Sequence, residues 1–291
     1  MAQNNNFIDI GHLQVRVNSS VASMPIENAS IEISYSGDPE SHVETLTTNS
    51  SGQSEVLDLA APPLEYSMEP HTEQPYSEYT IKVSARGHET ATFTGTQILP
   101  EVTALQNVVL TPTTSPLSQP DSFVIGPHTL FGDYPPKIAE AEIKPVNETG
   151  EIVLSRVVVP EFIVVHDGPI NDASAQNHYV RYRDYIKNVA SCEIYATWSE
   201  NTIMANVLAI MSFTLNRVYT EWYRNKGYNF TITSSTAYDH KWMPGKNVFD
   251  SIDRAVDSLF GNYLSRPGVK QPILTQYCDG KRVTCPNWMT E

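Results

Sequence analysis

The residue of this sequence that is best placed to do acid–base chemistry is Glu193. It lies between Cys192 and Ile194, and the residues around it are mostly apolar. Apolar surroundings disfavour the charged form of a carboxyl group, so such a group tends to stay protonated. A protonated carboxyl group can act as a general acid and, once it has lost its proton, as a base. The alternative is that Glu193 is a structural helix residue paired with a nearby cation.

A polar loop, residues 234–241, has a composition suited to holding N-acetyl sugars. Tyr238 offers a ring for stacking and Asp239 offers hydrogen-bond acceptors, so both are candidate substrate-binding residues. The alternatives are half-buried packing for the tyrosine and a turn-forming side chain for the aspartate. The pair His240–Lys241 is expected to be exposed.

The chain has three cysteines, which allow at most one intramolecular disulfide. Cys192 has no evident histidine partner in the sequence, and we interpret it as a small buried thiol rather than a nucleophile. Cys278 and Cys285 bracket a six-residue loop, and a disulfide between them would hold that loop. Cysteine usage alone does not settle the compartment.

Two helices within residues 184–223 are expected to position Glu193. A short helix is followed by a bend at residues 196–198 and by a long helix. The long helix has apolar residues at steps of three and four, which is helical periodicity; they include Ile203, Val207, Ile210, Met211, Leu215, Val218 and Trp222. A helix that is apolar on most sides is expected to lie in a domain core.

The part of the chain before these helices is expected to be β-structure. Residues 12–17, 29–34 and 79–85 alternate between apolar and polar, and residues 102–110 are a last candidate strand. Turn signals rich in Gly, Asn, Asp and Pro separate these runs. The pattern predicts a small antiparallel β-sandwich, so the fold class expected for the whole chain is α+β.

A length of 291 residues is enough for two domains. Residues 1–112 are expected to form the β-sandwich, an accessory module with no chemistry of its own. Residues 113–150 are rich in proline and are expected to form a semi-extended linker, where an activating protease would cut. Residues 151–291 are expected to form the second domain, which begins with a strand near residues 162–168.

The formal net charge of −14 argues against a nucleic-acid partner, because phosphate binding needs clustered Lys and Arg. Peptidoglycan and neutral sugars remain compatible with an acidic surface. No apolar run approaches the length needed to span a bilayer. The N-terminal residues have neither a basic start nor an apolar stretch, so no secretory signal is visible.

Four stretches in the second half, taken in order, resemble the stage II sporulation protein D (SpoIID/LytB) domain and most of all its branch of clostridial spore cortex-lytic enzymes (SleC). They are VVVPEFIVVHDGPI, DYIKNVASCEIYATW, ITSSTAYDHKWMPG and LTQYCDGKRVTCPNWM. The strand order of the first half also resembles carboxypeptidase regulatory-like, transthyretin-like modules, through GHLQVRV, IENASIEI, TTNSSGQSEVLDL and YTIKVSARGHETATF.

The SpoIID/LytB resemblance implies a lytic transglycosylase of spore cortex peptidoglycan, active in germination and located outside the cytoplasm at the spore or cell wall. The family's catalytic acid falls on Glu193, and Gln276 and Tyr277 fall in its glycan-side segment. One Glu would serve first as acid and then as base, giving 1,6-anhydro products. No cofactor is expected. A zinc site at Cys278 and Cys285, found in some members of the wider family, is the alternative to a disulfide.

Two departures from the family pattern matter. An arginine of the family's long helix aligns with Met211, and the family's chain continues beyond the motif with which this sequence ends, so the domain is expected to be C-terminally truncated. The alternative function is therefore a non-catalytic cell-wall-binding or structural protein that keeps a SpoIID scaffold. A third option is hydrolysis, for which Asp239 is the candidate second carboxylate.

Overall fold

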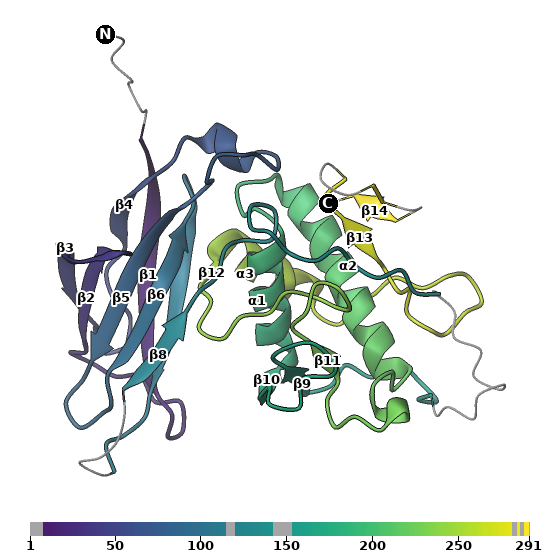
Figure 1. Ribbon diagram of the computed structural model, residues 1–291. Helices are drawn as coiled ribbons and strands as arrows, with labels where there is room; N and C mark the ends of the chain where they lie inside the picture. Colours follow the sequence, from purple (N-terminus) through teal and green to yellow (C-terminus); the bar gives the residue numbers. More distant parts are fainter. Residues whose placement is uncertain (1–7, 115–119, 142–152, 281–283, 286–287, 291) are drawn as a thin grey trace, which may run out of the picture. The chain divides into compact units, whose positions relative to one another are not determined.

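The computed structural model describes residues 8–114, 120–141, 153–280, 284–285 and 288–290 (Figure 1). The fold is mixed α+β, with several sheets and, in the described residues, three α-helices. The chain divides into two compact units. The first unit contains Met1–Pro127, Tyr195–Trp198 and Pro244–Ser251, and the second contains His128–Ile194, Ser199–Met243 and Ile252–Glu291.

In its described residues, the first unit contains two sheets and one short 3₁₀-helix. One sheet has the strand order β12-β7-β1-β4 and the other has the order β3-β2-β5-β6-β8. The elements are β1 (Asp9–Ser19), β2 (Ser30–Tyr35), β3 (Asp38–Thr47), β4 (Leu57–Ala61), η1 (Leu64–Ser67), β5 (Ser77–Ser84), β6 (Ala91–Ile98), β7 (Thr103–Leu110), β8 (Asp121–Val124) and β12 (Val248–Phe249).

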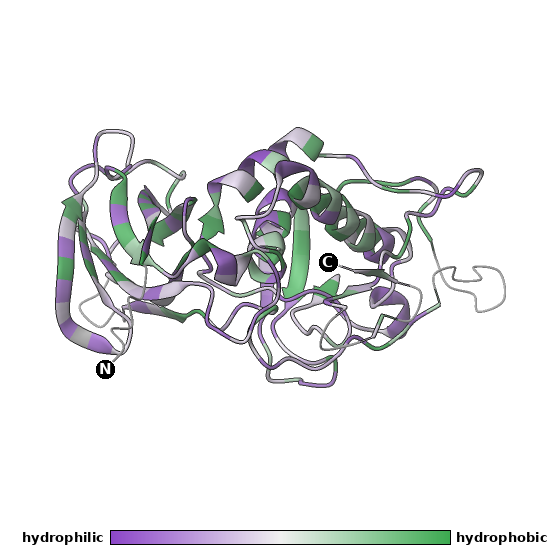
Figure 2. Cartoon of the chain, turned by 90° about the horizontal axis from the view of Figure 1, so that it is seen from above, coloured by the Kyte–Doolittle hydropathy of each residue, from purple (hydrophilic) through white to green (hydrophobic). Residues whose placement is uncertain are grey.

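The alternation of apolar and polar residues explains why these segments form half-buried strands. In β1, Leu13, Val15 and Val17 are fully buried while Gln14 and Arg16 are partly exposed. Successive side chains of a strand point to opposite faces, so every second residue enters the core. Figure 2 shows the same banding of hydrophobic and hydrophilic residues along the strands of this unit. The strands predicted at residues 12–17, 29–34, 79–85 and 102–110 are confirmed.

The prediction that the sandwich is antiparallel was wrong, because both sheets are mixed. β1 pairs in parallel with β7, from His12 opposite Thr103 to Ser19 opposite Leu110. β6 pairs in parallel with β8. The chain turns after β6 through Glu101, which has a positive φ of 62°, and β7 then joins the sheet of β1 rather than returning beside β6. The consecutive strands β6 and β7 therefore lie in different sheets.

Two segments of the first unit come from outside the predicted sandwich. β8 lies within residues 113–150, which were expected to be a linker, and it pairs with β6. β12 pairs with β7 although it follows it by more than 130 positions in the chain. Beside β12, the Asn247 side chain accepts a hydrogen bond from the Gln97 N–H and donates one to the Gln97 carbonyl, each at 3.0 Å. The first unit thus extends past residue 112, where the sequence suggested a boundary.

The second unit is built around two buried helices. Its elements are β9 (Phe162–His166), β10 (Asn177–Arg181), α1 (Tyr182–Glu193), α2 (Glu200–Tyr219), η2 (Arg224–Lys226), β11 (Ile232–Thr233), β13 (Tyr277–Cys278) and β14 (Met289–Thr290), together with α3 (Asp250–Leu259) from its third residue onward. The strands form a sheet of order β10-β9-β11 and the pair β13-β14.

The sequence predicted α1, α2 and the break between them, and the structure confirms all three. The side chain of Ser199 caps α2 by accepting a hydrogen bond from the Thr202 N–H at 3.3 Å. Serine at this position satisfies one of the free N–H groups of the first turn. Most of α2 is buried, as its all-round apolar pattern indicated. Among the described residues, no helix is both long and apolar enough to cross a lipid bilayer.

Candidate active site

Glu193 is the last residue of α1, and its side chain is only 4% exposed. Even so, it reaches the wall of a small pocket of about 90 Å³ in the second unit. The pocket is also lined by Tyr134, Lys137, Tyr277, Asp279 and Trp288. A carboxyl group that is nearly buried yet borders a cavity can meet a ligand while being shielded from bulk water.

Both carboxylate oxygens of Glu193 accept hydrogen bonds. The backbone N–H of Lys241 donates to Oε1 at 2.6 Å, and the hydroxyl of Tyr277 donates to Oε2. Burial raises the pKa of Glu193, while the charge of Lys137 and these two hydrogen bonds act in the opposite direction. The net direction is upward, so Glu193 keeps its proton to a higher pH than an exposed glutamate does.

Among the charged groups, Lys137 lowers the pKa of Glu193 the most. Its ammonium group donates a hydrogen bond to the backbone carbonyl of Asp239 and lies 5.0 Å from the ring centre of Phe213 and 5.5 Å from that of Tyr277. These contacts hold the charge against two aromatic rings, of which that of Tyr277 lines the pocket. Lys137 lies in the proline-rich stretch that was expected to be a linker, and nothing in its local pattern signals this role.

Tyr134 adds a second aromatic wall. Burial raises its pKa to about 12, so its hydroxyl stays neutral and can donate a hydrogen bond. The ammonium of Lys241 lies 5.3 Å from the centre of its ring. The sequence did show one signal, an aromatic residue within the proline-rich run Gly132–Pro136, but not where the ring would pack.

The expectation that His240 is exposed was wrong. Its ring is fully buried, stacks on Tyr277 with ring centres 5.9 Å apart, and its Nδ1 lies 3.3 Å from the Tyr185 hydroxyl. Burial lowers the pKa of His240, so the ring is neutral. His240 therefore supports the ring of Tyr277 from behind instead of facing solvent.

Asp239 is not available to a substrate, contrary to its assignment as a sugar-binding residue. It is fully buried, and its carboxylate accepts hydrogen bonds from Arg217 Nε at 2.7 Å and from the Tyr223 hydroxyl at 2.5 Å. The N–H and hydroxyl of Thr233 donate to it at 2.9 and 2.7 Å. A buried charge is stable only when it is paired and hydrogen-bonded, which makes Asp239 part of the scaffold. It is also unsuited to be the second carboxylate of a hydrolase.

The other predicted substrate-binding residues lie in different places. Tyr277 lines the Glu193 pocket. Gln276 is buried, and its side-chain amide accepts from the N–H of Glu140 and donates to the Glu140 carbonyl, each at 2.9 Å. Tyr238 is half-buried, is not among the residues that line the pocket, and its backbone carbonyl accepts from Arg217 at 3.0 Å. The structure thus brings Tyr277 to Glu193 and leaves Gln276 and Tyr238 in supporting positions.

Arg217 was missed in the sequence. Its guanidinium is buried at the end of α2 and binds Asp239 and, through two hydrogen bonds of 2.8 Å, the carboxylate of Glu140. A planar guanidinium matches a carboxylate in this two-point geometry. The available signal was an arginine within a helix otherwise expected to be buried, since a buried arginine requires acidic partners.

Cys278 and Cys285 form a disulfide with a Cα–Cα distance of 5.7 Å. Both thiols are used, and no group of three or more His, Cys, Asp or Glu in the described residues could hold a metal ion. The zinc alternative is therefore not supported. The disulfide starts one residue after Tyr277, so it restrains the segment that carries Tyr277 and Asp279. Cys192 is a buried free thiol, as expected.

No protein-family model and no curated protein matches this sequence. Solved structures give only partial similarity. The Bacillus anthracis TIE protein is 13% identical with a TM-score of 0.25, over 36% of this chain and 17% of that one. Wild-type catechol 1,2-dioxygenase from Acinetobacter radioresistens is 14% identical with a TM-score of 0.25, over 41% and 59%. The minor pilin GBS52 of Streptococcus agalactiae is 13% identical with a TM-score of 0.26, over 38% and 48%.

In each of these three pairs the match spans less than two thirds of the other protein. Similarity at this level carries no functional argument, and none of the three is a SpoIID/LytB protein. The resemblance to that family stays a prediction.

Proposed function

We propose that the second unit is a lytic transglycosylase that cleaves the glycan strands of peptidoglycan, with Glu193 as general acid and then general base. The observation that supports this most is a nearly buried carboxyl group with a raised pKa on the wall of a pocket. Enzymes use burial in this way to keep a carboxylic acid protonated near neutral pH. The sequence motif around Glu193 points to the same residue.

The chemistry follows from the two hydrogen bonds on Glu193. The protonated carboxyl group donates its proton to the oxygen between muramic acid and glucosamine, and the bond from that oxygen to the sugar C1 breaks. The Tyr277 hydroxyl and the Lys241 N–H then stabilise the carboxylate that forms. The carboxylate takes the proton of the 6-hydroxyl as that oxygen attacks C1. The product is a 1,6-anhydro sugar, and Glu193 regains its proton.

The residues around Glu193 suit a sugar. Tyr134 and Trp288 supply aromatic side chains, and Thr129, Thr236 and Asp279 supply polar atoms. Sugar rings stack on aromatic faces while their hydroxyls need hydrogen-bond partners. Because the pocket holds only about 90 Å³, the glycan would lie across its mouth and present the scissile oxygen to Glu193.

A hydrolase is the second candidate, and one observation favours it. Asp279 lines the same pocket as Glu193, and hydrolysing glycosidases use two carboxylates. In that case Asp279 would activate water, and the product would be a reducing sugar. A non-catalytic wall-binding protein is the third candidate. The lytic transglycosylase proposal also puts the protein outside the cytoplasm at the spore or cell wall, with residues 1–112 as an accessory module.

The test is to incubate the purified chain with isolated spore-cortex peptidoglycan and to analyse the products by mass spectrometry. The variants are Glu193→Gln, Asp279→Asn and, as a matched control, Glu161→Gln, whose side chain is exposed in the second unit. We expect 1,6-anhydro products from the wild type, Asp279→Asn and Glu161→Gln, and none from Glu193→Gln. Reducing ends that depend on both Glu193 and Asp279 would indicate the hydrolase. Sedimentation with the wall but no release by any form would indicate the binding protein.

A further inference from the structure

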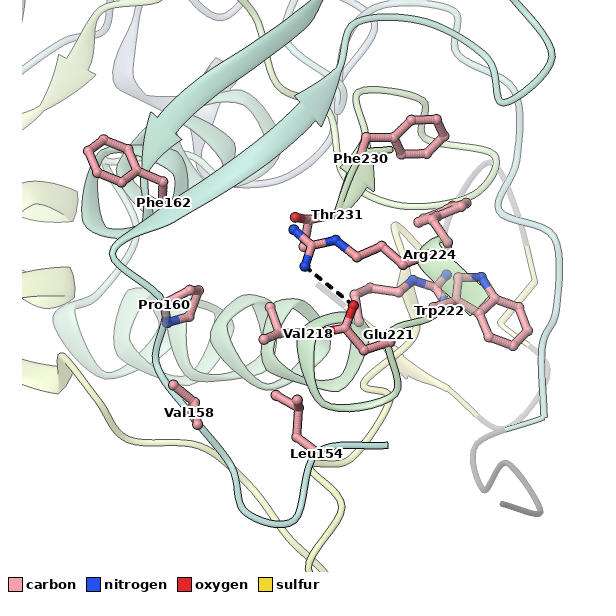
Figure 3. A pocket seen from close by; sticks show the side chains of 12 residues that line it. Leu154, Val158, Pro160, Phe162, Val218, Glu221, Trp222, Arg224, Phe230 and Thr231 are labelled. Carbon is pink, nitrogen blue, oxygen red and sulfur yellow. Dashed lines mark ion pairs between the residues drawn. The ribbon is translucent and has the colours of Figure 1, made fainter. Parts of the chain in front are cut away.

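The second unit contains another pocket, of about 300 Å³, at the C-terminal end of α2 (Figure 3). Its walls come from three parts of the chain: the segment before β9, the end of α2 with the turn that follows, and the segment before β11. Neither Glu193 nor any other residue lining the first pocket contributes to it. The two pockets are therefore separate sites within the second unit.

Most of this pocket is apolar. Leu154, Val158 and Pro160 form one side, Val218 lies at the centre, and Phe230 and Trp222 form the other side (Figure 3). Aliphatic and aromatic walls of this kind favour an apolar group of a ligand, because its transfer from water is favourable. The walls alone do not select a ligand class. The charged groups of the pocket do.

Two opposite charges lie in the pocket. The Arg224 guanidinium extends from η2 across it and lies 3.5 Å from a carboxylate oxygen of Glu221 (Figure 3). This distance is long for a hydrogen bond between charged groups, which is usually about 2.7–2.9 Å. The side chains are 54% and 20% exposed, so the pair is weak and both groups can meet a ligand. Arg217, also in the wall, is instead committed to Asp239 and Glu140.

The backbone of Glu221 is a second observation. Its φ of 46° lies in the left-handed region. The Glu221 N–H bonds to the Val218 carbonyl and the Trp222 N–H to the Arg217 carbonyl, at 3.2 and 3.3 Å. This is the Schellman arrangement that ends a helix, and its left-handed position is usually glycine. Here a glutamate occupies it and turns its carboxylate toward the pocket, although glycine would fit the backbone better.

We propose that this pocket binds a small zwitterion with an apolar side chain, that is, an apolar α-amino acid. The carboxylate of the ligand accepts hydrogen bonds from Arg224, the ammonium donates to Glu221, and the side chain packs between Val218, Phe230 and Trp222. Each charged group of the ligand replaces one half of the weak pair between Glu221 and Arg224. Such a ligand would contact the apolar walls, the exposed Arg224 and Glu221 at the same time.

Isothermal titration calorimetry with the full chain tests the proposal. Leucine and phenylalanine are the probes, and glycine, which lacks a side chain, is the negative control. N-acetylleucine and leucinamide each remove one charge and also represent the C-terminal and N-terminal ends of a peptide. The variants are Arg224→Gln, Glu221→Gly and the control Arg183→Gln, whose arginine pairs with Asp257 at the surface.

We expect leucine and phenylalanine to bind and glycine not to bind. Arg224→Gln and Glu221→Gly should each weaken binding of leucine by about tenfold or more, since each removes a charge-assisted hydrogen bond. Glu221→Gly should also raise the melting temperature, because glycine suits the left-handed backbone position. A loss of affinity in this variant would therefore not result from misfolding. Arg183→Gln should bind as the wild type does.

Three results would overturn the proposal. The first is no heat signal for leucine or phenylalanine with the wild-type chain. The second is unchanged affinity in Glu221→Gly and Arg224→Gln. The third is binding of N-acetylleucine or leucinamide as tight as that of leucine, because the pocket would then recognise the end of a peptide, or only an apolar group. None of these results depends on whether Glu193 cleaves glycan.

Discussion

The hydroxyl of Tyr277 donates a hydrogen bond to Oε2 of Glu193, although the two residues are 84 positions apart in the sequence. Tyr277 begins the short pair β13-β14, whereas Glu193 ends α1. The ring of His240 stacks on the ring of Tyr277. The backbone N–H of the next residue, Lys241, donates a hydrogen bond to Oε1 of Glu193. The protonation of Glu193 is thus controlled by residues from three separate segments of the second unit.

Replacing Tyr277 with phenylalanine should raise the pKa of Glu193 further. The hydroxyl stabilises the carboxylate, so its loss favours the protonated form. In the proposed reaction Glu193 must start protonated, and the rate falls as the pH rises through its pKa. In Tyr277→Phe this fall should therefore occur at a higher pH, with a lower maximum rate. A pH–rate profile of anhydro-product release measures it, with Tyr238→Phe as control. A fall at unchanged or lower pH would contradict the expectation.

The raised pKa of Glu193 also has a consequence for stability. Glu193 binds its proton more tightly in the folded chain than in the unfolded chain, where its pKa is near the ordinary value of 4.5. Its contribution to stability is therefore fully present below that value and is lost as the pH rises through the higher folded-state pKa. Relative to Glu193→Gln, the wild type should become less stable as the pH rises across this window.

Urea denaturation of both forms at a series of pH values measures this difference. The exposed Glu161→Gln variant is the control, and its stability should follow that of the wild type at each pH. If the wild type instead gained stability over Glu193→Gln as the pH rose, the pKa of Glu193 would be lowered by folding, and its assignment as an acid would lose its main support.

Arg217→Met should destabilise the second unit by about 3–5 kcal/mol, because it leaves a buried carboxylate without its cation. The guanidinium and the carboxylate of Asp239 are both buried and lie 2.7 Å apart. The double variant Arg217→Met with Asp239→Asn should lose less than the sum of the two single variants, because the interaction is removed as a whole. The exposed pair Arg181–Glu161, at 3.5 Å, provides the control.

Chemical denaturation gives these free energies of unfolding. Arg181→Met should cost no more than about 1 kcal/mol, as is usual for ion pairs at a surface. A similarly small cost for Arg217→Met would mean that Asp239 and Glu140 do not depend on it, and that the buried arrangement is not what holds α2 to its neighbours.

The disulfide between Cys278 and Cys285 should be detectable by counting thiols. Alkylation of the unfolded, unreduced chain should label one cysteine, Cys192, and alkylation after reduction should label all three. Cys192→Ala should show no free thiol before reduction. Replacing Cys278 and Cys285 with serine should cost about 2–3 kcal/mol, the loop-closure entropy of a short loop.

That double variant should also lower the proposed activity, because the disulfide restrains the segment next to Tyr277. Three labelled cysteines without reduction would show that the bond does not form in solution. An unchanged rate in the double variant would show that the position of Tyr277 does not depend on the disulfide.

The sequence alone predicted the elements whose pattern is local. Alternation along residues 12–17 and steps of three and four along α2 each follow from the geometry of one segment. The apolar residues next to Glu193 in the sequence predicted its burial in the same way, and the structure confirms that burial. These predictions needed no knowledge of where distant segments lie.

The tertiary structure decided the partners. The spacing of residues did not reveal that β7 would pair in parallel with β1. It also did not reveal that Lys137, from the proline-rich stretch, would line the Glu193 pocket, or that Asp239 would form a buried ion pair with Arg217. The residue type alone indicates only that a polar side chain needs a hydrogen-bond or charge partner when it is buried. Which partner it finds depends on long-range packing, which brings together groups that no local period relates.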